Sequence, residues 1–332
     1  MQTKFIQVGV GPLGRQIVLR ALERRDLRIA GAVDIAPELH GKDVGEICGV
    51  DAVGVPISAS LEEAVHDSEA EVLVLATVSS IAALETQIRA AAPFGLSIVS
   101  TCEELSYPWR AHLEEARRID ELCRKHRIAC LGTGVNPGYL MDYLPSVLTT
   151  LCNRVTKVEV ERVQDAAHRR IPFQQKIGAG LTLEEFEVRK QSGTLRHVGL
   201  LESVAMLAAA LGWELERMEE TLNPVVATER ESSGYQVIES GRARGVEQVG
   251  SGWVAGREVI RLAFRAAVGE PGSHDTVTIT GTPSFRSSID GGVNGDIATA
   301  AVTLNAAKVI GALNPGLRTM LDLPVAGSWG WG

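Results

Sequence analysis

The feature that most constrains this chain is a glycine-rich turn near its start. Gly9, Gly11 and Gly14 have G-x-G-x-x-G spacing. Residues 4–8 before them form a short apolar run typical of a buried strand, and residues 16–22 after them have helical apolar periodicity. In this context the glycines permit a tight turn, a close approach of pyrophosphate to the backbone and close packing of helix on strand. The stretch therefore predicts a dinucleotide-binding turn.

An acidic residue lies where such a site needs one. Residues 27–33 read as a second strand, and Asp34 ends it, 20 residues beyond Gly14. A carboxylate at this point can bind the adenosine ribose. We expect Pro12 and Leu13, at the start of the helix, to lie beside the phosphates, because the first N–H groups of a helix have no intrahelical partner.

The cofactor is predicted to be NAD or NADP. Asp34 disfavours a 2′-phosphate by charge repulsion, and the nearest cationic candidates for binding one are His40 and Lys42. The alternative interpretation is a glycine-rich turn followed by an ordinary surface aspartate.

Strands and helices alternate through the first part of the chain. Apolar runs at 71–77, 96–100 and 128–132 read as further strands separated by helical segments. This alternation predicts a doubly wound parallel (Rossmann) sheet of the α/β class. Ligands of such sheets lie beyond the carboxyl ends of the strands, so we expect Thr77 and Thr101 to contact the cofactor.

The pattern changes near residue 138. Segments rich in Val, Thr and Ile predict strands at 154–164, 225–228, 246–254, 258–268 and 275–281. Helices are expected at 139–151, 183–191 and 198–211, and a basic loop at 173–180. We therefore predict two domains: a Rossmann domain of residues 1–137 with about 295–332, and an α+β domain of residues 138–294 with a mostly antiparallel sheet.

Composition excludes several classes of function. A net charge of −8 argues against nucleic-acid and anionic-membrane partners. We find no apolar run long enough to span a membrane and no signal-peptide pattern. The five cysteines are scattered, without C-x-x-C pairs, which favours free thiols in the cytoplasm over disulfides or a zinc site. No metal is expected.

Two adjacent acids follow the strand at 96–100. Glu103 and Glu104 would lie at the nicotinamide end of the sheet edge, where a carboxylate can hold an amine and move protons while hydride is transferred. Glu104 is the first choice, because it takes the position of the lysine in the Glu-Lys-Pro motif of related two-domain dehydrogenases. The alternative is that both acids only begin a helix, where the dipole favours them.

Several stretches together resemble the 2,4-diaminopentanoate dehydrogenase family, which includes the native amine dehydrogenases. They are residues 9–14, 101–105, 132–138, Arg169-Arg170, 176–180, 197–199 and 315–324. The resemblance covers nearly the whole chain. It implies NAD(P)-dependent oxidative deamination of an amine, or reductive amination of a ketone with ammonia. It also places the catalytic glutamate in the Glu103-Glu104 pair, and it implies a homodimer formed through the second domain.

Dihydrodipicolinate reductase is a more distant resemblance. Its His-His-Lys substrate motif would fall at residues 165–170, where the chain has one histidine and no lysine. A C=N reductase of that kind stays an alternative function, as does a dinucleotide-binding sensor without catalysis.

The remaining candidates would contact the substrate. Arg169 and Lys176 could bind a carboxylate, or they could form a solvated basic edge. His197 could be a polar wall residue or a core histidine. Tyr139 and Tyr143, one helical turn apart in the predicted helix, could line the carbon chain or belong to the core. Residues Asn136 and Pro137 suggest a fixed turn at the interdomain hinge, and Asn136 is a further substrate candidate. These cations favour a keto acid or amino acid over a simple ketone.

Overall fold

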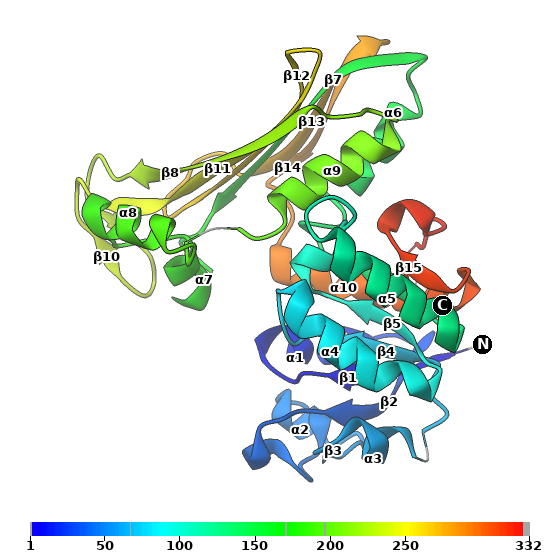
Figure 1. Cartoon of the computed structure of the whole chain (residues 1–332). Helices are drawn as coiled ribbons and strands as arrows, with labels where there is room; N and C mark the ends of the chain where they lie inside the picture. Colours follow the sequence, from blue (N-terminus) through cyan, green and yellow to red (C-terminus); the bar gives the residue numbers. More distant parts are fainter. Residues whose placement is uncertain (1, 67, 170, 196, 328–332) are drawn as a thin grey trace. The chain divides into compact units, whose positions relative to one another are not determined.

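The computed structural model describes residues 2–66, 68–169, 171–195 and 197–327. The chain divides into two compact units (Figure 1). Unit 1 comprises Met1–Tyr139 and Asn294–Gly332, and unit 2 comprises Leu140–Val293. Each unit has its own sheet, so each is described by itself.

Unit 1 contains a seven-stranded parallel sheet with the order β15-β6-β5-β4-β1-β2-β3. Its strands are β1 (Thr3–Val8), β2 (Leu27–Val33), β3 (Ile57–Ser58), β4 (Val72–Leu75), β5 (Ser97–Ser100), β6 (Ala129–Gly132) and β15 (Gly316–Arg318). All four residues of β4 are buried, as expected for a strand covered on both faces. The predicted doubly wound sheet is confirmed.

Helices cover both faces of this sheet. The helices α1 (Pro12–Leu22) and α10 (Gly295–Val309) pack against each other and against the strands of one face. On the other face, α3 (Leu61–Val65), α4 (Ile81–Ala91) and α5 (Leu113–His126) share an apolar core with the strands. The four-residue helix α2 (Val44–Ile47) lies between β2 and β3 in the chain.

Unit 2 is built on a six-stranded sheet with the order β14-β13-β7-β12-β11-β8. Its strands are β7 (Arg154–Asp165), β8 (Arg217–Val226), β11 (Ala243–Val254), β12 (Arg257–Ala267), β13 (His274–Thr282) and β14 (Phe285–Asp290). Only β7 and β12 pair in parallel, so the predicted mostly antiparallel sheet is confirmed. A separate two-stranded ribbon joins β9 (Glu231–Ser232) to β10 (Val237–Ile238).

The helices of unit 2 are α6 (Tyr143–Thr149), α7 (Ile171–Lys176), α8 (Leu183–Gln191) and α9 (Leu200–Ala210). Helix α9 packs on β8, β11 and β12. Two glycines of β11 allow this close contact: a Cβ on Gly250 would lie 3.0 Å from Leu200, and one on Gly252 would lie 3.1 Å from Val204.

Three predictions for unit 2 are wrong in detail, and one strand was missed. The helix expected at 139–151 is limited to α6, because the chain makes turns until Asp142, whose carboxylate accepts a hydrogen bond from Tyr143 N. The basic loop expected at 173–180 begins inside helix α7. The strand expected at 225–228 is the end of β8, and β14 was missed. The start of β8 was missed because the polar residues Glu219, Glu220 and Thr221 interrupt its apolar pattern.

The helices of residues 2–66, 68–169, 171–195 and 197–327 are all too short or too polar to cross a membrane.

Candidate active site

The glycine turn between β1 and α1 has the conformation that its sequence predicts. Gly9 has a φ of +87°, and a Cβ there would lie 2.5 Å from the Ala76 carbonyl oxygen. A Cβ on Gly14 would lie 1.9 Å from the Gly9 carbonyl oxygen, so only glycine lets α1 pack this closely. At Gly11 a Cβ would meet nothing within 4 Å. The turn is therefore crowded at its two outer glycines and open at the middle one.

The open side of the turn is the start of α1. Gly11 is the N-cap residue and provides no side-chain cap, Pro12 begins the helix, and the first turn contains no acid. The N–H groups at this end and the positive end of the helix dipole are thus left to bind an anion.

Asp34 is fixed beside the turn, at the end of β2. Its carboxylate accepts hydrogen bonds from Val10 N at 2.6 Å and from Ala36 N at 2.9 Å. His40 does not extend toward a phosphate position, since its Nε2 lies 2.9 Å from the Asp34 carbonyl oxygen. The neighbouring residue Ile35 is 92% exposed. Two backbone bonds hold the carboxylate at the edge of the sheet.

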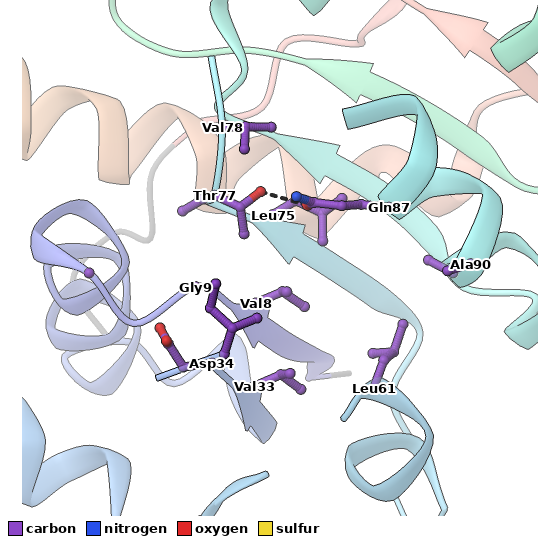
Figure 2. Close-up of a pocket in the computed structure, with 14 residues that line it drawn as sticks. Val8, Gly9, Val33, Asp34, Leu61, Leu75, Thr77, Val78, Gln87 and Ala90 are labelled. Atoms are coloured by element: carbon purple, nitrogen blue, oxygen red, sulfur yellow. Dashed lines mark hydrogen bonds between the residues drawn. The ribbon is translucent and has the colours of Figure 1, made fainter. Parts of the chain in front are cut away.

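A cavity of about 450 Å³ opens between β1, β2 and β4 (Figure 2). Its walls are mostly apolar, and its polar groups include Asp34 and the hydrogen-bonded pair of Thr77 Oγ1 and Gln87 Oε1, 2.6 Å apart. The lining residues are Val8, Gly9, Gly11, Val33, Asp34, Ile35, Leu61, Leu75, Ala76, Thr77, Val78, Gln87, Ala90 and Ala91. An apolar cavity that ends at a carboxylate and an uncapped helix start fits an adenosine diphosphate group.

A smaller cavity of about 150 Å³ lies beyond the ends of β4 and β5. It is lined by Leu13, Ala76, Thr77, Val78, Ser79, Thr101 and Glu103. Thr77 lines both cavities. The two cavities thus bring together Leu13, Thr77, Thr101 and Glu103, all predicted from the sequence, at one edge of the sheet.

The structure gives the two adjacent acids different surroundings. Both belong to the 3₁₀ helix Glu103–Leu105. Glu103 lines the smaller cavity. Glu104 accepts a hydrogen bond from Ile81 N, at the start of α4, at 2.9 Å. One acid therefore reaches the cavity, while the other binds the start of a helix.

Asn136 follows β6 and is 8% exposed. Among the described residues, neither polar atom of its side-chain amide has a hydrogen-bond partner. An unsatisfied buried amide is costly, which is a reason to expect a ligand there.

The two predicted tyrosines differ in backbone structure. Tyr139 lies in a turn and Tyr143 begins α6, so they are not one turn apart on a common helix, and that prediction is wrong. Both side chains are half-buried.

The basic side chains of unit 2 lie around the end of β7. The Arg169 guanidinium lies over the Phe173 ring, 4.2 Å from its centre, and Lys176 is the exposed last residue of α7. Arg170 lies outside the described residues. Gln174 fixes the preceding turn, because its Nε2 donates to the carbonyl oxygens of Ala166 and Arg169.

His197 belongs to the same region. Burial, and then the charges of Lys176 and Arg162, lower its pKa from 6.5 to about 3. Gln248 holds its backbone on both sides: Oε1 accepts from His197 N at 2.7 Å, and Nε2 donates to His197 O at 2.9 Å. The ring meets Phe264 edge-on at 4.6 Å. His197 is therefore a neutral imidazole among cations.

A neutral, half-buried histidine makes stability depend on pH. Its folded pKa is below its unfolded value, so the unfolded state binds more protons and stability falls as pH drops below about 6.5. Between pH 7 and pH 5 we expect the wild type to lose about 1–2 kcal/mol more unfolding free energy than His197→Gln. Urea unfolding at both pH values measures this difference. His168→Gln, at an exposed histidine of the same unit, is the control; equal losses in all three proteins would contradict the prediction.

Sequence reasoning missed a buried ion pair in unit 2. Arg162, on β7, is 2% exposed, and its Nη1 donates to Asp275 Oδ1 at 2.6 Å. The pair holds the Val293 peptide from both sides: Arg162 Nη2 donates to its carbonyl oxygen at 2.9 Å, and Asp275 Oδ2 accepts from its N–H at 2.7 Å. Burial lowers the pKa of Arg162 against the opposing effect of Asp275. One feature of the sequence could have indicated that Arg162 is buried. It alternates in phase with Val158 and Val160, so it lies on the same face of the strand as these two valines.

Comparison with known proteins identifies the family of this chain. The family model for the 2,4-diaminopentanoate dehydrogenase C-terminal domain matches residues 139–330, and the model for the dihydrodipicolinate reductase N-terminus matches residues 3–120. A 2,4-diaminopentanoate dehydrogenase from Acetoanaerobium sticklandii is 30% identical over 98% of this chain and 94% of its own length. The chain belongs to the 2,4-diaminopentanoate dehydrogenase family.

Other relatives are similar over less of the chain or only in fold. The 4-hydroxy-tetrahydrodipicolinate reductase of Synechocystis is 38% identical, but over 21% of this chain and 23% of its own. The solved structure of an amine dehydrogenase from Mycobacterium smegmatis has a TM-score of 0.86 at 21% identity, with 99% of this chain and 98% of that chain covered. The 2,4-diaminopentanoate dehydrogenase family thus accounts for both units, whereas the reductase similarity is confined to a part of the chain.

Proposed function

We propose that this protein is an NAD(P)-dependent amine dehydrogenase, an oxidoreductase that acts on a CH–NH₂ donor. It converts a protonated primary amine, NAD(P)⁺ and water into a ketone, NAD(P)H, ammonium and a proton, and it runs reductive amination in reverse. The observation that carries the proposal is the dinucleotide site of unit 1 with a carboxylate, Glu103, in its second cavity, in a chain of the 2,4-diaminopentanoate dehydrogenase family.

When bound, the cofactor would accept the hydride. The α1 N-terminus and Gly11 would hold its pyrophosphate, and Asp34 its adenosine ribose. Glu103 would take a proton from the substrate ammonium, because it is the acid that lines the smaller cavity. This assignment differs from the first choice made from the sequence, Glu104. The bond from Ile81 N supports a positioning role for Glu104.

The substrate is proposed to be a short amino acid, or its keto acid in reverse. The cationic side chains of Arg169 and Lys176 suit a carboxylate, and the neutral His197 adds a polar group without a charge. The unpartnered amide of Asn136 supports a polar contact with the ligand. Tyr139 and Tyr143 remain candidates for the carbon chain. The relative from Acetoanaerobium sticklandii carries 2,4-diaminopentanoate in its name, which makes that diamino acid the first compound to assay.

The decisive assay follows NADH and NADPH consumption with short ketones and keto acids, with and without ammonium. Turnover that requires ammonium supports amine dehydrogenation, as does NAD(P)⁺ reduction by 2,4-diaminopentanoate. Turnover of a preformed cyclic imine alone would instead support a dihydrodipicolinate-type reductase. Tight dinucleotide binding without any turnover would support a sensor.

Cofactor preference gives a second test in unit 1. We expect NAD to bind better than NADP, because the fixed Asp34 carboxylate would repel a 2′-phosphate and His40 is bonded to the Asp34 carbonyl. Asp34→Asn keeps a hydrogen-bond acceptor but removes the charge, so it should reduce the preference for NAD by about 10-fold. The ratio of kcat/KM for the two cofactors measures this, and an unchanged ratio would contradict the assignment.

A homodimer is proposed to form through the sheet face of unit 2 opposite α9. This face has self-complementary charges, such as Lys157 at 2.8 Å from Glu159 and 3.2 Å from Glu258. It also carries the small apolar residue Ala263, which alternates with the buried Leu262. Ala263→Arg should yield monomers in light-scattering chromatography, whereas Val188→Arg, at an exposed position of α8, should not. A monomeric wild type would refute the dimer.

We also propose a cytoplasmic location. All five cysteines are free, which suits a reducing compartment. Fractionation of cells that express the protein tests this.

A further inference from the structure

One face of helix α4 forms a wall of the larger cavity in unit 1. Gln87, Ala90 and Ala91 all line this cavity, and their spacing of three and four residues places them on the same side of the helix. The two alanines leave space in front of the helix. Gln87 is therefore the one long side chain that α4 contributes to the lining.

Polar side chains are few in this cavity. Of the described residues that line it, Asp34, Thr77 and Gln87 alone have polar side chains. Figure 2 shows Asp34 on one side of Gly9, and Thr77 with Gln87 on the other. Because Asp34 is assigned to the ribose, the polar side chains left to meet the base of a bound dinucleotide are Thr77 and Gln87.

The carboxamide of Gln87 is held in place but not fully used. Thr77 Oγ1 donates a hydrogen bond to Gln87 Oε1 at 2.6 Å, and this bond takes up the hydrogen of the hydroxyl group. Within the part of the chain that the structure describes, Gln87 Nε2 has no hydrogen-bond partner. Two N–H donors and one lone pair of Oε1 are therefore left for a ligand.

This set of groups matches one edge of adenine. The N6 amino group of adenine donates and its N7 accepts, so a glutamine carboxamide can bind both at once. Hypoxanthine has an oxygen at position 6, so the same edge presents two acceptors. Turning the amide over does not remove this mismatch, because the amide always presents one acceptor. The apolar residues Leu61, Leu75 and Val78 contact a purine ring without distinguishing the two bases.

We propose that Gln87 selects adenine as the base of the dinucleotide, through paired hydrogen bonds to N6 and N7. The inference deepens the proposed function and rests on it, since it requires the dinucleotide to occupy this cavity. A site that hydrogen-bonds a ligand group rejects an analogue lacking that group more strongly than an apolar wall does.

The test compares NADH with reduced nicotinamide hypoxanthine dinucleotide by fluorescence titration of the full-length protein. We expect the wild type to bind the hypoxanthine compound with a Kd about 10-fold higher than that of NADH. Gln87→Leu should raise the NADH Kd by about 10-fold and leave the other Kd nearly unchanged, which brings the ratio close to 1. The matched control is Gln16→Leu, at a half-buried glutamine of α1 that does not line the cavity, and it should keep the wild-type ratio.

Three results would overturn the selection of adenine by Gln87. The first is equal Kd values for the two dinucleotides in the wild type, a measurement that needs no variant. The second is a Gln87→Leu protein that keeps the wild-type ratio. The third is a loss that affects both dinucleotides equally, which would show that Gln87 only shapes the cavity.

Failure of this inference is distinguishable from failure of the proposed function, because the titrations contain no amine. Equal Kd values in a protein that oxidises amines would refute the role of Gln87 alone. The expected ratios in a protein that oxidises no amine would refute amine dehydrogenation alone. A wild type that binds neither dinucleotide would refute both.

Discussion

Replacing Glu103 with glutamine should lower kcat for amine oxidation by about 10²- to 10⁴-fold, the range for losing a general acid–base group. Glu103 lines the cavity at the ends of β4 and β5, where a substrate ammonium would meet the nicotinamide. Glutamine keeps the size of the side chain but takes up no proton. Cofactor affinity should change little, because the turn at Gly9–Gly14 and Asp34 lie elsewhere on the sheet edge. Steady-state kinetics with fluorescence titration of NADH measures both quantities.

Glu104→Gln is the matched control for this experiment. Its amide oxygen can still accept the bond from Ile81 N, so the start of α4 should stay intact. We expect a loss of at most about 10-fold, smaller than the loss in Glu103→Gln. The opposite order of effects would make Glu104 the acid that meets the substrate, as the sequence first suggested.

The second large effect is expected at Gly14. A Cβ there would lie 1.9 Å from the Gly9 carbonyl oxygen, so Gly14→Ala must displace either α1 or the turn. We expect a loss of stability of about 2–4 kcal/mol, in the range for overpacking and backbone strain, together with loss of dinucleotide binding. Urea unfolding and NADH titration measure the two changes.

Gly11→Ala separates binding from folding. Gly11 has φ −68° and ψ −173°, which alanine adopts without strain, and a Cβ there meets nothing within 4 Å. Stability should therefore stay near that of the wild type, while the methyl group occupies space needed by the pyrophosphate. We expect the NADH Kd to rise about 10- to 100-fold. If Gly11→Ala bound NADH as the wild type does, the phosphates would not lie against this glycine.

Much of unit 1 could be predicted from local sequence. The glycine turn, the strand at 27–33 and the buried run at 71–77 each combine a pattern with a steric or hydrogen-bonding requirement that few other folds satisfy. The structure of unit 2 was harder to predict, because its long strands alternate charged and apolar residues and its helices are short. Tyr139 shows the limit: apolar periodicity continued through it, but the backbone turns until Asp142 caps α6.

The sequence predicted which residue types belong to the candidate site better than it predicted the role of each residue. The sequence placed Glu103 and Glu104 together after a strand, but which of them reaches the cavity depends on the turn of the 3₁₀ helix and on the donor at Ile81. Arg162 was missed because a single arginine in a strand of alternating glutamates looks exposed. Its burial requires Asp275, more than a hundred residues away in the chain, and no local pattern reports that pairing.

The chain order of the two units has a consequence for synthesis on the ribosome. Unit 2 ends at Val293, so its whole sheet has been synthesised before α10 and β15 exist. Until residues 295–318 emerge, the first unit lacks the helix that packs against α1, β4 and β5, and also the strand that pairs with β6. The part of the chain that is synthesised first is therefore the part whose core is completed last. Its apolar surfaces stay exposed in the nascent chain while the inserted unit folds.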